Sequence, residues 1–295
     1  MTAFPDKKTI MSAEEFSSLR DLIEREFGIL LRGDRRLTLH TKVSHRLSIL
    51  GLSTYKEYYD FIVADPTREE LFILASHITN NETYFFRERP QLDALAEILQ
   101  DIKREKQGGE QRLRILSLAS SSGEEAYSLN ILIHESGLFA WNWDVEIIGI
   151  DIDRTAVSKA HAATYTANSF RSLNGDMSRI QRYFTVEDGR YELKRAYAKN
   201  VEFRHANILD SGLYAGLAPV DVIFCRNVLI YMSDPATERL VSNFSSALTE
   251  TGYLFIGSAE SLIQKTNLFT PEYREKVIVY RKNSEAQADA GQQRT

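Results

Sequence analysis

The 295 residues are 43% hydrophobic and 26% charged, which is the composition of an ordinary globular protein and excludes a disordered chain, a collagen-like repeat and a disulfide-stapled mini-fold. Lys and Arg total 36 against 41 Asp and Glu, so the net charge is −5 and we expect no basic field for wrapping nucleic acid. Cys225 is the only cysteine, which excludes an intrachain disulfide and a thiolate metal cage; no metal site is expected.

The first ten residues, MTAFPDKKTI, lack the basic flank and the apolar run of a secretory signal. No later stretch approaches the roughly 18 apolar residues that a membrane span needs. We therefore expect a cytoplasmic protein that is not inserted into a membrane. Any contact with a membrane protein would be made from the water side.

Residues 12 to about 104 have the pattern of successive helices without a strand between them. Glycines that end helices, a capping box and prolines that begin helices predict the boundaries. These residues are Gly28 and Gly51, the pair Thr54 and Glu57, and Pro66 and Pro90.

The pattern changes at about residue 107, where short apolar strands begin to alternate with helical segments. This alternation predicts an α/β domain with a parallel sheet covered by helices on both faces, closed by a final antiparallel pair. We therefore expect a helical domain with a linker helix over residues 1–107 and a sheet domain over 108–282. The expected strands are 113–118, 146–150, 201–204, 220–224, 253–257 and 276–280.

A small β insertion is expected within the sheet domain, at about residues 171–200. Residues 182–186 and 190–194 have strand character and flank Asp188-Gly189, a favoured hairpin turn. Residues 283–295 are polar and are expected to form a disordered tail.

The first expected strand runs into small residues, Ala119 to Gly123, that precede a helix. Such a turn lets a ligand approach the backbone and the free N–H groups of a helix start. The single glycine does not make the G-x-G-x-x-G of a dinucleotide fold. Glu124 and Glu125 would repel a pyrophosphate, which favours a cationic ligand.

Asp151 and Asp153 end the second expected strand. A carboxylate at this position suits the two hydroxyls of a ribose, but it also suits the start of the helix at Arg154. We assign Asp151 to the ribose and Asp153 to helix capping; the alternative for Asp151 is that it too only caps the helix.

Two further stretches combine polar and aromatic residues. Residues 79–88 interleave Asn, Thr and Arg with three aromatics, which either pack in a core or line a ligand site. Residues 224–231 place polar groups just past a buried strand, at the carboxyl edge where open α/β sheets bind ligands.

In combination, these motifs resemble the chemotaxis receptor glutamate methyltransferases, the CheR family, over nearly the whole chain. The motifs are T-x-x-x-T-x-F-F-R from Thr79 to Arg87, S-x-G-E-E-x-Y-S from Ser121 to Ser128, D-I-D from Asp151 to Asp153, and F-C-R-N-V-x-I-Y from Phe224 to Tyr231.

The resemblance implies a Rossmann-like sheet that binds S-adenosylmethionine. It implies methyl transfer to glutamates on the cytoplasmic helical bundle of a methyl-accepting chemotaxis receptor, giving methyl esters and S-adenosylhomocysteine. The implied cofactor contacts are Asn81, Thr83, Arg87, Glu125, Asp151, Asn207, Ile208, Arg226 and Asn227, and Arg87 and Tyr231 would flank the reacting centre.

The residue chemistry is compatible with this reaction. A glutamate with a pKa of about 4.3 is ionised at neutral pH, so it attacks a sulfonium methyl without a general base. Positioning then supplies the catalysis. The alternatives are that Arg87 pairs with Glu88 or Glu125 and that Tyr231 only packs in a core.

A cluster of cations in the helical domain suits an acidic receptor helix, as the family resemblance also implies; the alternative is a solvated basic face. Its members are Arg35, Arg36, Lys42 and Arg46. The resemblance also implies that some members bind a receptor C-terminal pentapeptide with a related β subdomain. Because the turn here is short and an extended Gly-rich loop is missing, we expect no strong binding of such a peptide. The rival functions are a methyltransferase with another substrate and a non-catalytic S-adenosylmethionine-binding scaffold.

Overall fold

The structure, a computed structural model, describes residues 10–33, 35–139 and 142–284. It divides into two compact units. The first contains the described residues up to Asn80 together with Tyr231–Ala236, and the second contains Asn81–Ile230 and the described residues from Thr237 onward. Most of the predicted disordered tail, residues 285–295, lies outside the described residues.

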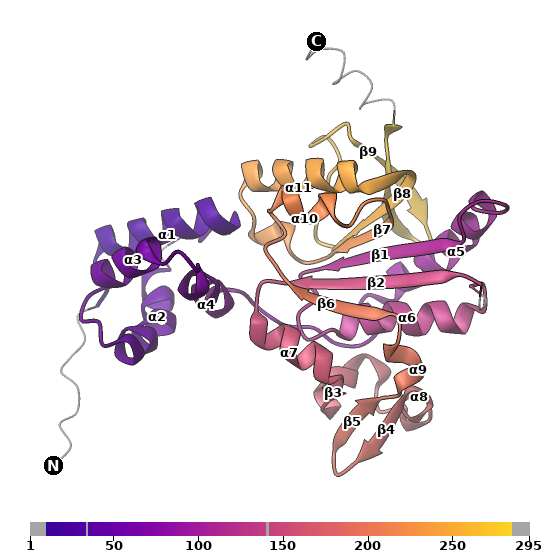
Figure 1. Cartoon of the computed structure of the whole chain (residues 1–295), viewed down its shortest axis with the longest axis horizontal. Helices are drawn as coiled ribbons and strands as arrows, with labels where there is room; N and C mark the ends of the chain where they lie inside the picture. Colours follow the sequence, from indigo (N-terminus) through magenta and orange to yellow (C-terminus); the bar gives the residue numbers. More distant parts are fainter. Residues whose placement is uncertain (1–9, 34, 140–141, 285–295) are drawn as a thin grey trace. The chain divides into compact units, whose positions relative to one another are not determined.

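Helices make up the first unit, as the sequence predicts (Figure 1). They are α1 (Ala13–Phe27), α2 (Arg36–Leu50), α3 (Tyr55–Ala64) and α4 (Glu69–Ile78). Gly28 and Gly51 end α1 and α2 with φ angles of 67° and 69°, the left-handed conformation that favours glycine. Thr54 and Glu57 form the predicted capping box of α3.

The start of α4 differs from the prediction. The helix begins at Glu69 rather than at Pro66. The Asp65 carboxylate accepts hydrogen bonds from the backbone N–H and the hydroxyl of Thr67, at 2.9 and 2.6 Å. These bonds hold Pro66 in a turn, because an Asp side chain competes with the helix for backbone donors.

Among the described residues, the main sheet of the second unit has seven strands in the order β6-β2-β1-β7-β8-β10-β9 (Figure 1). The first five are parallel, and β10 is antiparallel to both β8 and β9. The predicted antiparallel closure is thus confirmed, but β9 was not predicted, because this edge strand is mostly exposed and contains Pro271. The strands are β1 (Arg112–Leu118), β2 (Asp144–Asp151), β6 (Val201–His205), β7 (Val220–Cys225), β8 (Leu248–Ile256), β9 (Phe269–Arg274) and β10 (Val277–Lys282).

Helices cover both faces of this sheet. The chain moves from β1 through β2 to β6 in one direction and from β7 to β8 in the other, so right-handed crossovers put α6 and α7 on one face and α10 and α11 on the opposite face (Figure 1). These helices are α6 (Glu124–Ser136), α7 (Arg154–Ala162), α10 (Ser211–Ala215) and α11 (Asp234–Ala247). The carboxyl ends of the parallel strands therefore meet at one edge.

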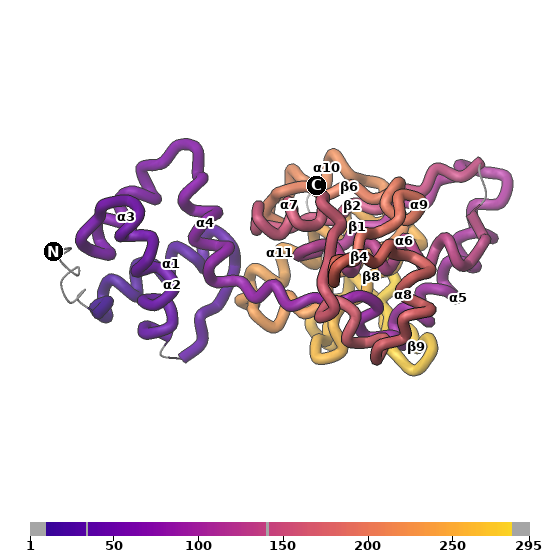
Figure 2. Tube along the Cα trace, turned by 90° about the horizontal axis from the view of Figure 1, so that it is seen from below, coloured from indigo at the N-terminus to yellow at the C-terminus, as the bar shows by residue number. Residues whose placement is uncertain are grey.

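Helix α5 (Arg89–Glu105) belongs to the second unit rather than to the helical domain. Its apolar stripe, which includes Leu92, Leu95 and Leu99, is buried in the same hydrophobic core as β1 and β2. The first compact unit therefore ends at residue 80, and the expected linker helix lies in the second unit. Between α4 and α5 the chain runs without helix or strand (Figure 2).

The β insertion is larger than predicted. Its sheet has the order β3-β5-β4 and begins at Thr164, while Arg182 and Tyr183 are helical. The predicted hairpin turn is confirmed: Asp188 and Gly189 have φ of 48° and 74°, as a tight type I′ turn requires. Its elements are β3 (Thr164–Tyr165), η1 (Ala167–Leu173), α8 (Met177–Tyr183), β4 (Phe184–Glu187), β5 (Arg190–Leu193) and α9 (Arg195–Ala198).

Candidate active site

The chain turns sharply between β1 and α6. Ala119, Ser121 and Gly123 have φ of 55°, 50° and 92°, and strained backbone of this kind clusters at ligand sites. A Cβ on Gly123 would lie 2.8 Å from the Phe203 ring, so only glycine fits this close approach. The turn brings the start of α6 against the end of β2.

Asp151 ends β2 and is 4% exposed. Its carboxylate accepts the backbone N–H groups of Ser121 at 2.7 Å and Asp153 at 2.8 Å. Burial raises the pKa of Asp151 to about 6, against the opposing effect of these bonds. The group is therefore mostly ionised at pH 7, and a carboxylate accepts about four hydrogen bonds, so acceptor capacity remains for a hydroxyl donor.

Asp153 caps α7, as predicted, by accepting the Thr155 N–H at 2.8 Å. Its other oxygen accepts a 2.6 Å hydrogen bond from the Asn81 amide. The Ser121 hydroxyl donates to the Asn81 carbonyl at 3.0 Å. The stretch that precedes α5 is thereby fastened to the ends of β1 and β2.

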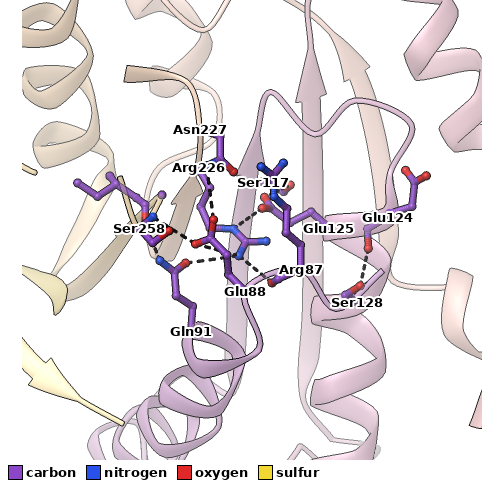
Figure 3. A network of polar contacts seen from close by, with 12 residues as sticks. Arg87, Glu88, Gln91, Ser117, Glu124, Glu125, Ser128, Arg226, Asn227 and Ser258 are labelled. Carbon is purple, nitrogen blue, oxygen red and sulfur yellow. Dashed lines mark hydrogen bonds and ion pairs between the residues drawn. The ribbon is translucent and has the colours of Figure 1, made fainter. Parts of the chain in front are cut away.

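Arg226, which directly follows β7, forms an ion pair with the partly buried Glu125 in the first turn of α6 (Figure 3). The Arg226 Nε donates to Glu125 Oε2 at 2.6 Å, and the Ser117 hydroxyl donates to the other oxygen at 2.7 Å. Arg226 also donates to the Arg87 carbonyl at 3.0 Å. Since Arg226 neutralises Glu125, the helix start is less negative than the sequence suggests.

Glu88 joins the same network (Figure 3). It lies 3.9 Å from Arg226 and accepts from the Asn227 amide at 3.4 Å and from the Ser258 N–H at 3.2 Å. Arg226 thus contacts both Glu88 and Glu125, the glutamates considered above as partners of Arg87.

Glu260 is a site residue that the sequence analysis missed. Its carboxylate accepts the backbone N–H groups of Asn227 at 3.0 Å, Gly257 at 2.5 Å and Ile230 at 3.2 Å. These bonds hold Asn227 at a φ of 60°. No local signal marks Glu260, because most of its partners are about 30 residues away in the sequence.

The three aromatics of the 79–88 stretch separate into two roles. Phe85 and Phe86 are buried in the hydrophobic core, so the core-packing alternative applies to them. Tyr84 is half-buried and lies under two guanidinium groups, with Arg171 at 3.9 Å and Arg87 at 5.5 Å from the ring centre. The Arg87 Nη1 donates to the Glu82 carbonyl at 2.9 Å.

Glu124 has a structural role in the second unit. It is buried and accepts the hydroxyl hydrogens of Ser122 at 2.7 Å and Ser169 at 3.0 Å. The Ser169 bond connects the start of α6 to the β insertion.

The remaining predicted contacts lie on other segments. Asn207 and Ile208 follow β6, whose parallel pairing places His205 opposite Asp151, and the Asn207 side chain accepts the Leu209 N–H at 3.0 Å. The structure leaves the Thr83 side chain partly exposed.

Tyr231 ends the short helix η2 (Leu229–Tyr231) and belongs to the first unit. Its carbonyl accepts the Leu30 N–H at 2.8 Å, next to a bridge between Ile29 and Met232. The side chain is 47% exposed, which does not fit the core-packing alternative.

In the helical unit, Arg35 and Lys42 are exposed and Arg36 is partly exposed. Arg46 differs, because its guanidinium donates to both carboxylate oxygens of the buried Glu70, at 2.9 and 2.5 Å. Tyr58 donates to the same carboxylate at 2.9 Å. Arg46 therefore stabilises the packing of α2 against α4, and its charge is compensated within the unit.

Within the described ranges, no cluster of His, Cys, Asp and Glu side chains is arranged to hold a metal ion. Among the same residues, every helix is too short or too polar to cross a membrane.

Comparisons with known proteins agree with the division into two units. Residues 14–79 match the family described as CheR methyltransferase, all-alpha domain, and residues 81–278 match CheR methyltransferase, SAM binding domain. The chain is 31% identical over 282 residues to chemotaxis protein methyltransferase 2 of Vibrio cholerae, covering 95% of this chain and 96% of the relative.

Two relatives come from Pseudomonas aeruginosa. Chemotaxis protein methyltransferase 1 is 33% identical over 256 residues, covering 84% of this chain and 90% of the relative. The probable biofilm formation methyltransferase WspC is 31% identical over 265 residues, covering 90% of this chain and 61% of the relative.

Proposed function

This chain belongs to the CheR methyltransferase family and is a methyltransferase that binds S-adenosylmethionine; we propose that it methylates glutamate side chains of a chemotaxis receptor. The observation that carries this proposal is that residues of all four motifs meet at the carboxyl edge of the sheet. Asn81 bonds to Asp153, and Arg226 joins Glu125 to the Arg87 carbonyl.

The residues at this edge fit the parts of the cofactor. Asp151 is buried, mostly ionised at pH 7 and retains acceptor capacity for a ribose hydroxyl. Asn207 and Ile208 leave the neighbouring strand and would lie beside the adenine, together with Arg226 and Asn227. We assign the methionine end of the cofactor to Asn81, Thr83, Arg87 and Glu125.

When bound, the cofactor supplies a methyl group activated by its sulfonium. The protein then has to bring an anionic glutamate in line with that methyl group, and no proton has to be removed first. We assign to Arg87 the orientation of the glutamate carboxylate. Tyr231 would supply the hydroxyl group that lies beside the methyl group. Arg87 is held by Glu82 and Tyr84, and a loose contact with substrate avoids stabilising the ground state.

For receptor binding we propose the exposed Arg35 and Lys42 together with the partly exposed Arg36. An acidic, glutamate-bearing helix complements them. Arg46, the fourth cation of this cluster, is paired with Glu70 and would contribute by stabilising the helix rather than by direct contact with the receptor.

The tight Asp188-Gly189 turn leaves our expectation of weak pentapeptide binding unchanged. Calorimetry with a receptor C-terminal pentapeptide tests this expectation.

The experiment is transfer of labelled methyl from S-adenosylmethionine to candidate receptors. We expect label that is released by alkali, as methyl esters are, and that is lost when the receptor glutamates are changed to alanine. Asp151→Ala is the control that removes the proposed ribose contact and should abolish both transfer and S-adenosylhomocysteine binding. Cofactor binding without methylation of any receptor would favour the non-catalytic scaffold, and alkali-stable label would favour another substrate class.

A further inference from the structure

The β insertion is built around the stretch that carries Arg87. The Phe85 N–H donates to the Ser169 carbonyl at 2.9 Å, and the Ser172 hydroxyl donates to the Phe85 carbonyl at 2.5 Å. The Phe85 ring stacks on Phe170, with centroids 5.0 Å apart and planes 6° apart. The stretch before α5 is therefore part of the insertion's core.

Arg171, in η1 of the insertion, contacts the three residues that precede Phe85. Its Nη2 donates to the Glu82 carboxylate at 2.9 Å, and its Nη1 donates to the Thr83 carbonyl at 3.4 Å. Its guanidinium lies 3.9 Å from the centre of the Tyr84 ring. A planar guanidinium can make all these contacts at once, whereas a lysine ammonium cannot.

The same residues hold Arg87. The Glu82 carbonyl accepts its Nη1, and the Tyr84 ring lies 5.5 Å from its guanidinium. Glu82 and Tyr84 are therefore each contacted by both arginines. The Glu82 carboxylate also compensates the charge of Arg171, so that two like charges can lie close to one ring.

We propose that Arg171 is a positioning residue for Arg87, acting through Glu82 and Tyr84, and that the β insertion thereby sets the geometry of the cofactor site. The inference rests on the proposed cofactor contact of Arg87. Without Arg171, Glu82 and Tyr84 lose the contacts that fix them, and the Arg87 guanidinium loses its defined place.

A matched control lies in the same insertion. Arg182 also contacts an aromatic ring, Tyr183 at 5.8 Å, and a carboxylate, Glu135 at 3.3 Å. Neither partner belongs to the stretch that holds Arg87. A loss common to Arg171→Met and Arg182→Met would reflect only the insertion's stability.

The test is calorimetric titration with S-adenosylhomocysteine, together with the thermal unfolding midpoint of each variant. We expect Arg171→Met to weaken binding about fivefold to tenfold, the size of coupling seen between residues that share partners, and Arg182→Met to leave it unchanged. Arg171→Lys should weaken it nearly as much as Arg171→Met. In the Arg87→Lys background, Arg171→Met should weaken S-adenosylhomocysteine binding by less than about twofold.

Equal losses in the two backgrounds would overturn the proposal, and so would unchanged affinity in Arg171→Met. Should Arg171→Met fail to fold, Tyr84→Phe and Tyr84→Leu provide the same test: the ring-keeping variant should bind normally and the leucine variant weakly. Similar binding by both would contradict the inference. Because these readouts use only S-adenosylhomocysteine, a failure to methylate receptors would contradict the proposed function while leaving this test intact.

Discussion

Asp151 and Glu125 both lie at the carboxyl edge of the sheet, but their surroundings differ. Glu125 is paired with Arg226, whereas Asp151 is bonded to backbone N–H groups. Burial therefore raises the pKa of Asp151 to about 6, because its backbone N–H bonds offset only part of the cost of desolvation.

This raised pKa predicts a pH-dependent affinity. If Asp151 binds the ribose as proposed, the ribose hydroxyl donors favour the ionised carboxylate, so a proton must leave Asp151 on binding wherever it is protonated. Affinity for S-adenosylhomocysteine should therefore be constant above about pH 7 and fall below pH 6, by about tenfold at pH 5. Calorimetry across this range measures it.

Asp151→Asn is the control for this titration. The amide cannot ionise, so we expect weak binding at pH 7 without the further loss at low pH. His205 lies near this strand end, and burial lowers its pKa; the asparagine variant retains that histidine. An equally steep decline in the variant would therefore assign the titration to another group.

At the scale of helices and strands, the sequence predicted what local signals encode. The caps of α1 and α3 and the Asp188-Gly189 turn depend on residues within a few positions of each other. Strand β9 lacks such a signal, because it is an edge strand held by its pairing with β10.

The sequence predicted those residues of the candidate site that lie at or just after the ends of strands. The motifs placed Asp151, Arg226 and Asn227 at the carboxyl edge of the sheet. Glu260 and Arg171 were not found, because their roles depend on contacts with segments far away in the sequence. The pairing of Arg46 with Glu70 was not predicted for the same reason, because the two residues are 24 positions apart.

The ion pair between Arg46 and Glu70 leads to a prediction about the helical unit. Arg46→Met leaves the buried Glu70 carboxylate with Tyr58 as its remaining described partner. Removing one partner of such a pair costs about 3 kcal/mol, so the local free energy of opening of α2 and α4 should fall by that amount. Native-state hydrogen exchange measures it.

The double variant Arg46→Met with Glu70→Gln should recover part of this loss, because a neutral amide can still accept the Tyr58 hydroxyl without burying a charge. Lys42→Met is the matched control on the exposed side of α2 and should not change exchange. Unaltered protection in Arg46→Met would show that the ion pair does not hold the helices together.

At the scale of the whole molecule, the net charge of −5 would oppose binding to the acidic receptor helix proposed above. Association would then depend on a local basic surface, whose field decays over about 14 Å at about 50 mM salt and about 6 Å at about 300 mM. If Arg35 and Lys42 form that surface, the KM for receptor should rise several-fold between about 50 and 300 mM salt, while affinity for S-adenosylhomocysteine stays nearly constant.

Lys42→Glu should raise the KM for receptor at low salt and flatten its dependence on salt, with kcat unchanged, because the substitution alters encounter rather than the cofactor site. Since Lys42 is exposed and Arg46 is paired with Glu70, this variant tests docking without disturbing helix packing. A salt dependence as steep as that of the unaltered protein would place the receptor-binding surface elsewhere.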